Sequence, residues 1–365
     1  TAAASGTISG AEIANGAVTA AKIATGADFT FNSVIVGKGA NSVAGNTVLG
    51  ESALDASVSG GDNTAIGINT LTDLTSGATN VALGHDSLKS ITTGSRNVAI
   101  GSATLDAITT TNNLTAVGTN ALGANTDGTG NVAVGYNSLD ENTTGTSNTA
   151  VGTSSLTTNI SGVNNTAVGN SALELNTSNN NTAVGKDALE ANTSGSQSTA
   201  VGASALTAAT TGGNNVAVGM NSMLSTTTGT ENVAMGVASL NDNTTGNYNV
   251  AIGRDALRSN TTANYNTAVG HDGLRLNTTG TSNVAVGAFA LDANTTGVEN
   301  TAVGVSALTN NTTGQHNAAF GHDALELNTT GTNNTAIGEQ AMEANTTGGN
   351  NTACGEAALH ANTTA

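Results

Sequence analysis

Apolar side chains recur along this chain at fixed places in a short unit that repeats almost to the last residue. In the stretch NTAVG, the residue after Asn (Thr or Val) and the apolar residue before Gly are separated by an Ala. Such alternation with a period of two predicts a short β-strand. A second apolar column lies at the Leu of [AS]L, which is replaced only by Met, at Met223 and Met342. We therefore expect two short strands in each unit.

Both apolar columns are predicted to line an interior. They include Val134, Val151, Val168, Val269 and Val286 before Gly, and Leu139, Leu156, Leu173, Leu274 and Leu291 in the second strand. By alternation, the Ala of NTAVG then points outward. A small apolar residue on an outer face indicates that another surface approaches closely, as it does along a symmetry axis. We therefore expect a homotrimer, because closed cyclic symmetry buries such a column without open-ended aggregation.

Glycine and asparagine mark the predicted turns. Gly reaches positive φ without penalty and Asn tolerates the left-handed region, so NTTG and the Gly of AVG are assigned to turns. Where Ala263 replaces the Gly of NTTG, we expect strain or another turn type. The Asn that opens each unit is nearly unbroken, and a stack of such residues predicts an amide ladder. These polar columns include Asn131, Asn148, Asn165, Gly135, Gly152, Gly169, Gly145 and Gly280.

The period defines the fold class. The Gly of AVG recurs every 17 residues from Gly50 to Gly169, after 16 residues at Gly185, and every 17 again from Gly202 to Gly355, which gives nineteen columns. Seventeen residues hold short strands and turns but not two helices, so the repeat predicts an all-β parallel β-solenoid of about nineteen coils. At about 4.8 Å per coil, the rod is about 90 Å long. The missing residue falls in the stretch NTSNNNTAVG, Asn176 to Gly185, in its turn and not in its strand, which leaves the strands in register.

The extent of the repeat divides the chain into two regions. Residues 46–365 form the repeat shaft, and residues 1–45 form an N-terminal neck or attachment segment. The neck contains its own short repeat, AEIANGAV and AAKIATGA, nine residues apart.

Composition narrows the possible partners. The chain has no Trp, no Pro and 2% aromatic residues, so its core must be narrow and built from small aliphatic side chains. A formal charge of −17 disfavours nucleic acid and anionic lipid. No apolar run approaches the length of about 20 residues that membrane insertion needs. The single cysteine excludes an internal disulfide.

Candidate chemistry is sparse. The tripeptide GHD at Gly84, Gly270 and Gly321 suggests metal or acid–base chemistry, but other coils carry GTS or GKD there, and neighbouring strand residues point to opposite faces. Acidic residues before NTT lack the spacing of a calcium-binding repeat, so they serve solubility. Cys354 occupies the Val column and is predicted to be buried. The NTT triplets are formal glycosylation sequons that the turn explains. We expect no catalytic residue, no cofactor, no metal site and no enzyme activity.

The coils NTAVGKDALEANTSGSQ and NTAIGEQAMEANTTGGN, with the neck GTISGAEIANGAVTAAKI, resemble the repeat shafts of bacteriophage tail fibres and related virion structural proteins. The resemblance covers almost the whole chain. It implies a rigid structural fibre that projects from a virion, attaches to other virion proteins through its N-terminal segment, and holds a host-receptor-binding tip. Members of this class often end in an endosialidase-type chaperone domain that drives trimer assembly.

Two alternatives stay open. The same repeats suit a bacterial or archaeal cell-surface or extracellular filament or adhesin, whose attachment partners are cell-surface proteins. Regular Thr columns also suit an ice-binding solenoid, although the adjacent Thr pair falls in a predicted turn and the strand Thr alternates with Val. The expected location is therefore the virion, the cell surface or the extracellular space.

Overall fold

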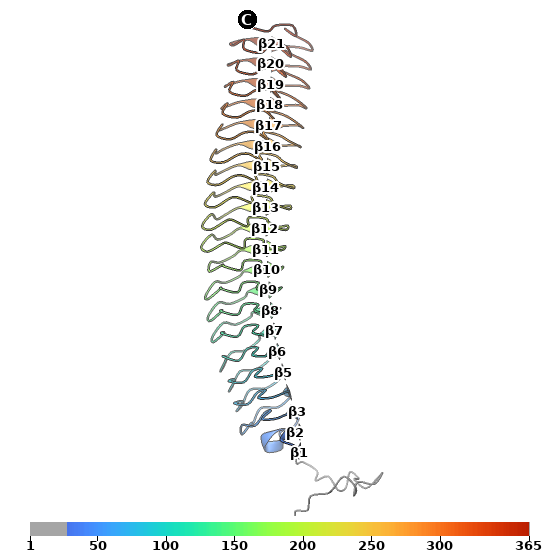
Figure 1. Ribbon diagram of the computed structural model, residues 1–365, viewed down its shortest axis with the longest axis vertical. Helices are drawn as coiled ribbons and strands as arrows, with labels where there is room; N and C mark the ends of the chain where they lie inside the picture. The colour runs from blue at the N-terminus through green and yellow to red at the C-terminus, as the bar shows by residue number, and fades with distance from the viewer. Residues whose placement is uncertain (1–27, 365) are drawn as a thin grey trace, which may run out of the picture.

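The computed structural model describes residues 28–364 of the chain, which form a long, gently curved rod (Figure 1). Strands β1 (Phe29–Phe31) and β2 (Val34–Gly37) form an antiparallel hairpin, and a short 3-10 turn, η2, spans Ala40–Ser42. Strand β2 also pairs antiparallel with β3 (Thr47–Gly50). The hairpin therefore covers the N-terminal edge of the stack that follows. The short repeat between Ala11 and Ala27 lies outside the described residues.

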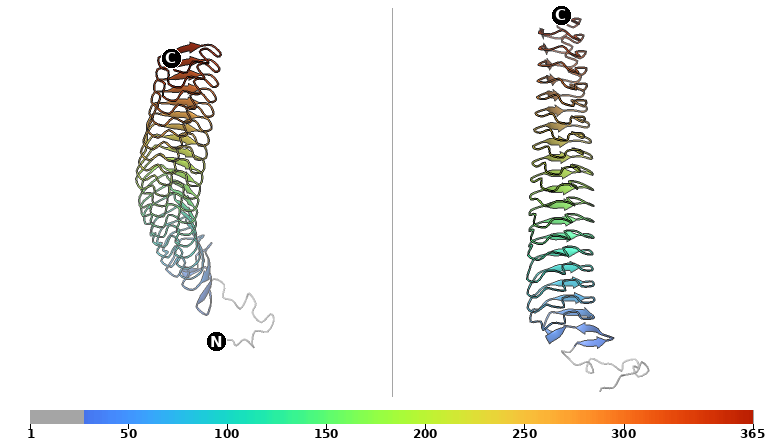
Figure 2. Two further views of the ribbon diagram at one scale, coloured as in Figure 1. Left: turned by 45° about the horizontal axis from the view of Figure 1, so that its top comes forward. Right: turned by 60° about the vertical axis from the view of Figure 1, so that its left-hand side comes forward.

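From β3 onward each coil contributes one strand, and each strand pairs parallel with the next. Figure 2 shows the strands stacked in a single column along the rod. The chain is thus an all-β parallel β-solenoid of 17-residue coils, as predicted. The remaining strands are β4 (Thr64–Ile66), β5 (Val81–Leu83), β6 (Val98–Ile100), β7 (Thr115–Val117), β8 (Val132–Val134), β9 (Thr149–Val151), β10 (Thr166–Val168), β11 (Thr182–Val184), β12 (Thr199–Val201), β13 (Val216–Val218), β14 (Val233–Met235), β15 (Val250–Ile252), β16 (Thr267–Val269), β17 (Val284–Val286), β18 (Thr301–Val303), β19 (Ala318–Phe320), β20 (Thr335–Ile337) and β21 (Thr352–Cys354).

The short coil keeps the register. Thr166 of β10 faces Thr182 of β11, and Ala167 faces Ala183, although only 16 residues separate them. The missing residue lies in the turn around Asn176, as predicted. A loss inside the strand would have exchanged its inward and outward side chains.

The predicted second strand is wrong. The segment around Leu139 is a run of turns, in which Asn137 has φ of 52° and Leu139 has φ of 51°. The residues alternate between left-handed and other conformations, so the backbone never extends. It still bonds to the coils on either side, since Asn137 N–H donates to the carbonyl of Thr119 at 3.0 Å and Leu139 N–H to that of Ser155 at 3.0 Å. Hydrogen bonding between coils thus continues without a strand.

The inward and outward side chains of the strand are the reverse of those predicted. The Ala between the two larger residues is fully buried, and the residue before Gly points outward. The predicted core residues Val134, Val151, Val168, Val269 and Val286 are therefore half-buried or exposed on the outer face. The Leu column is confirmed as core, with Leu139, Leu156, Leu173, Leu274 and Leu291 all at 0% exposure. Because the Ala points inward, the prediction that this Ala faces a symmetry axis is also wrong.

The Asn before each strand determines which strand residues point inward. Asn148 is fully buried, and its amide N–H donates to Oδ1 of Asn131 at 2.9 Å. Its own Nδ2 donates across the coil to the carbonyl of Gly162 at 2.8 Å. Because Asn148 points inward, the period of two also points Ala150 inward and Val151 outward. The predicted amide ladder is confirmed, and it lies inside the rod.

A second amide column runs through the interior at the Asn of NTT. Asn142 is fully buried, and its Nδ2 donates to Oδ1 of Asn125 at 2.7 Å and to the carbonyl of Gly145 at 3.2 Å. The core thus combines Ala and Leu columns with two amide columns. Such pairing up and down the rod is what buried polar groups require. The first complete coils instead carry Leu74, Ile91 and Ile108 in the second amide column.

The two glycine columns serve different purposes. The Gly of AVG has the predicted positive φ, with 142° at Gly135, 141° at Gly152 and 140° at Gly169. Gly145 and Gly280 are not among the positive-φ residues, so that part of the turn prediction is wrong. A Cβ at Gly145 would instead collide with the carbonyl oxygen of the next coil. Small size, not left-handed backbone, is what the Gly of NTTG supplies.

Ala263 does not change the turn type. Its carbonyl accepts from Nδ2 of Asn249 at 2.9 Å and of Asn260 at 3.1 Å, the same bonds that Gly accepts in other coils.

Candidate functional site

The most extended feature of the surface is the outer face of the parallel strands, which we call the apolar face. It consists of the two outward residues of each strand from β3 to β21, namely the first strand residue (Thr or Val, and Ala318 in β19) and the residue before Gly. None of these positions is charged. Leu49, Met235 and Ile337 are 46%, 44% and 45% exposed. An exposed apolar surface of this extent marks an interaction site.

Two columns of residues flank the apolar face. The column directly before the opening Asn, here called the Tyr edge, includes Tyr248 and Tyr265. Their rings stack in parallel, with centroids 5.1 Å apart and 2° between planes. The column directly after the Gly of AVG, here called the Arg edge, includes Arg254 and His271. All four side chains lie in two adjacent coils and are about half exposed or more.

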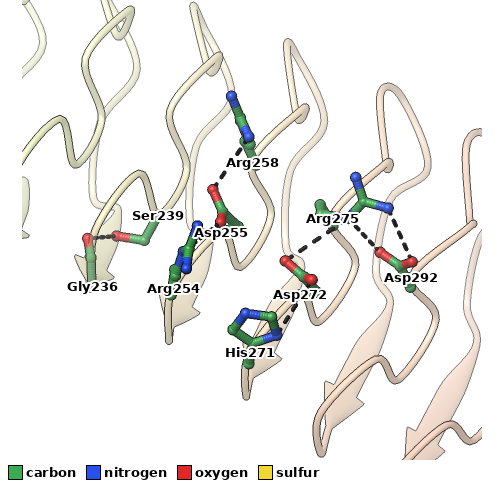
Figure 3. Close-up of polar contacts among 9 residues, drawn as sticks. All are labelled: Gly236, Ser239, Arg254, Asp255, Arg258, His271, Asp272, Arg275 and Asp292. Atoms are coloured by element: carbon green, nitrogen blue, oxygen red, sulfur yellow. Dashed lines mark hydrogen bonds and ion pairs between the residues drawn. The ribbon is translucent and has the colours of Figure 1, made fainter.

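Basic residues concentrate beside the Arg edge in a charged cluster that Figure 3 shows. Arg254 and Arg258 both contact Asp255, at 3.0 and 3.4 Å. Arg275 reaches Asp292 of the next coil through Nε at 2.9 Å and through a second guanidinium nitrogen at 3.2 Å. The same Arg275 lies 3.8 Å from Asp272, which His271 also contacts at 3.3 Å.

This cluster is balanced in charge. Three arginines, Arg254, Arg258 and Arg275, face three aspartates, Asp255, Asp272 and Asp292, so it presents no net positive surface to a phosphate or sulfate group. The bond from Arg275 to Asp292 joins neighbouring coils instead. This hydrogen bond is also the main reason that the pKa of Arg275 is raised.

Carboxylates stand at several positions of the column that follows the buried Leu. Burial is the largest cause of the raised pKa of Asp106 and Asp140, and the same holds for Glu190 and Glu326. Neighbouring carboxylates raise these pKa values further. In the described part of the chain, no group of three or more His, Cys, Asp or Glu residues is arranged to hold a metal ion.

The GHD residues lie in turns and not on opposite faces of a strand, which corrects the sequence argument. His85 contacts Asp86 at 3.3 Å and His322 contacts Asp323 at 2.9 Å. Asp86 has a lowered pKa, chiefly because Asn69 donates a hydrogen bond to it. These pairs are contacts between neighbours in sequence, and no metal-binding group forms around them in residues 28–364.

Cys354 is exposed, so the prediction of a buried cysteine is wrong. It stands in the outward column that was assigned to the interior.

The Asn residues of the NTT sequons point into the core. From Asn142 to Asn345 they are fully buried, so a glycosyltransferase has no access to them in the folded coil.

Sequence reasoning placed the amide ladder and the Leu column correctly but missed the apolar face. The available signal was the range of sizes in the column before Gly, which includes Met235 and Phe320. The stacked tyrosines were also visible as two aromatic residues one period apart.

Comparison with known proteins assigns no family, since no protein-family model and no curated protein matches this chain. None of the helices within residues 28–364 is long and apolar enough to cross a membrane.

Proposed function

We propose that this chain is the rigid shaft of an extended fibre, and that the fibre is a viral tail fibre whose shaft holds a receptor-binding tip away from the particle. The observation that carries the proposal is the continuous bonding between coils. Strand bonds run along the rod, and two buried amide columns and a Thr column run beside them through most of its coils. Bending the rod sharply would break several of these ladders at once.

The Thr column shows how completely the coils are joined. The first Thr of each NTT donates its hydroxyl to the carbonyl at the same position in the next coil. Thr278 bonds to Thr295 at 3.0 Å, Thr295 to Thr312 at 3.0 Å, and Thr312 to Thr329 at 3.1 Å. A repeat whose outer turns are also bonded suits a spacer, in which length grows with coil number.

The partners follow from the same proposal. The shaft assembles as a homotrimer, the N-terminal segment attaches it to other virion or cell-surface proteins, and a tip beyond the shaft meets the host receptor. The trimer no longer rests on an outward Ala. It rests on the apolar face, which a monomer would leave in water.

Electron microscopy of the native source with gold-labelled antibody against the coils tests the function. Label along thin fibres that project from virus particles is the expected result. Label on cell surfaces or on free filaments would overturn the viral assignment in favour of a surface filament or adhesin.

Ice binding is a second candidate, because the structure puts the strand Thr residues on the outer face. Thr149, Thr166, Thr182 and Thr199 stand outward in adjacent coils, at the regular spacing of parallel strands. Bulky residues such as Phe320 interrupt the flatness of this face. A thermal hysteresis measurement on the purified chain decides the matter, since an ice-binding rod shifts the freezing point and a fibre shaft does not.

A further inference from the structure

We infer that the apolar face is buried between copies of this chain that run parallel and at the same height, with the Tyr edge of each copy against the Arg edge of the next. The inference rests on the proposed shaft for its partner, a second copy of the chain. It adds the face, the orientation and the edge contacts.

The area of the face is sufficient for a stable interface. Three extended residues span about 10 Å, and nineteen coils at about 4.8 Å extend about 90 Å, so the face covers about 900 Å². A specific, stable interface buries about 800 Å² on each partner. Both outward columns are free of charge along the whole length, so their burial leaves no ion unpaired.

The orientation follows from what a symmetry axis does to heights along the rod. Rotation about an axis parallel to the rod leaves every residue at its own height. The Tyr edge of one copy then meets the Arg edge of the next at the same coil. Tyr248 comes level with Arg254, and Tyr265 comes level with His271. A guanidinium over a tyrosine ring is a favourable pairing. Both side chains are exposed, and each could take part while Arg254 keeps its bond to Asp255 and Tyr248 keeps its stacking on Tyr265.

The other coils are compatible with this pairing. From Asp62 and Ile68 to Asn350 and Glu356, no coil places like charges of Asp, Glu, Lys or Arg on both edges. An antiparallel arrangement centred on β12 would instead set Arg254 against the position of Thr153 in the other copy and lose the aromatic contact. The edges therefore favour parallel copies over antiparallel ones.

The distance between the edges sets the shape of the assembly. Six residues separate Tyr248 from Arg254, so the two edges are at most about 20 Å apart, because the chain bends on both sides of the strand. Facing sheets pack about 10 Å apart, so each lies about 5 Å from a central axis. A triangle whose sides lie about 5 Å from its centre has sides close to this width, and three copies then bring their edges together at the corners.

Thiol cross-linking tests the face and the orientation on the full chain. The wild-type chain carries its only cysteine, Cys354, on the apolar face at the last strand, and Cys354→Ser/Val201→Cys moves that cysteine to β12, the middle strand of the nineteen. A bismaleimide with a reach of about 10 Å matches the sheet spacing. Parallel copies at equal height give covalent dimers from both proteins. The control Cys354→Ser/Thr245→Cys, on the exposed Thr of an NTT turn, stays monomeric.

A second cysteine pair tests the edges and counts the copies. Ser282 and Ala288 hold the two edge positions of one coil, on opposite sides of the strand Val284–Val286. In a Cys354→Ser background, Ser282→Cys/Ala288→Cys gives a covalent ladder that ends at the trimer. Ser282→Cys alone and Ala288→Cys alone give no such ladder.

Each other outcome overturns a stated part. Cross-linking at position 201 without Cys354 overturns the parallel orientation, and no cross-linking at either position overturns the face. A dimer as the largest product of the edge pair overturns the triangular shape. Light scattering should give three times the chain mass of 35.3 kDa. If gold label falls on cells while these cross-links form, the viral function fails and the interface stands.

Discussion

Replacement of Ala209 by Asn should stabilise the rod, because it closes a gap in the second amide column. That column holds Asn in most coils but Ala209 and Thr226 in two adjacent ones. The side-chain carbonyl oxygen of Asn192, directly below the gap, is buried and accepts no hydrogen bond. In an intact coil the Asn above would donate to it, as Asn294 Nδ2 does to Oδ1 of Asn277 at 2.8 Å.

The magnitude follows from the cost of that unpaired oxygen. A buried acceptor without a partner costs about 1–3 kcal/mol. The amide introduced by Ala209→Asn would donate to Asn192 and to the carbonyl of Gly212, and its own oxygen would face the hydroxyl of Thr226. Part of the gain is offset by the entropy of ordering a new side chain. We expect the free energy of unfolding to rise by about 1–2 kcal/mol. The double variant with Thr226→Asn continues the column to Asn243 and should gain more.

The backbone already suits the change. Ala209 N–H donates to the carbonyl of Leu206 at 3.1 Å, and Asn294 N–H donates to that of Leu291 at 3.1 Å. Both residues are fully buried at equivalent places in the repeat. Asn294→Ala is therefore the matched opposite change, since it would leave Asn277 as Asn192 is now.

Native-state hydrogen exchange is the appropriate assay, because a long repeat array opens locally and a single global transition is not assured. Protection should increase in the coils around residues 192–226 for Ala209→Asn and decrease around residues 277–311 for Asn294→Ala. Unchanged protection in both variants would refute the reasoning, because it would mean that the amide columns add nothing to the stability of a coil.

Four further substitutions test the turns and the charges. Gly304 has φ of 143° and the carbonyl of the next coil against it, so Gly304→Ala should lower the free energy of unfolding by at least ~1 kcal/mol. In Gly273→Ala the new Cβ would meet nothing closer than 3.6 Å, so the free energy of unfolding should rise by ~0.5 kcal/mol. Chemical denaturation measures both changes. The pKa of Asp140 is raised mainly by burial, so its ionised form opposes folding. The free energy of unfolding should therefore rise as pH falls through that raised pKa toward 3.8, and Asp140→Asn should stabilise the rod at neutral pH and flatten this part of the pH profile. Arg275→Gln should cost less than ~1 kcal/mol, because the pair with Asp292 is partly exposed, and added salt should shrink the difference.

The repeat, the register and the Leu core could be predicted because each depends on spacing alone. A period of 17 requires stacked coils, and the one-residue deletion had to fall in a turn for the strands to stay paired. The stretch around Leu139 could not be predicted in the same way. Leucine at φ near 50° is rare, so an apolar residue flanked by polar ones is read as a strand, although here hydrogen bonds to both neighbouring coils hold the left-handed backbone.

The sequence does not say which face of the strand points inward, because both faces carry an apolar residue. Alternation says that Ala150 and Val151 face opposite ways, but not which one is inside. The buried Asn decides the question, since Asn148 must reach both Asn131 and the carbonyl of Gly162 across the coil. An exposed amide column would look the same in the sequence, so only the cross-coil bond resolves the choice.

Variation in size separates the inside from the outside more reliably than hydrophobicity does. The enclosed Leu column admits only Met as a substitute, and the enclosed Ala column admits only Val48, since a packed interior tolerates little change in volume. The outward column admits Val, Ile, Leu, Met, Phe and Cys, yet never a charge or an amide. Free contact with water would tolerate a Lys or Glu in at least some of nineteen coils. A column that varies in size but excludes every charge fits a surface that is covered by another chain, where a cyclic assembly brings residues of the same size together at each height.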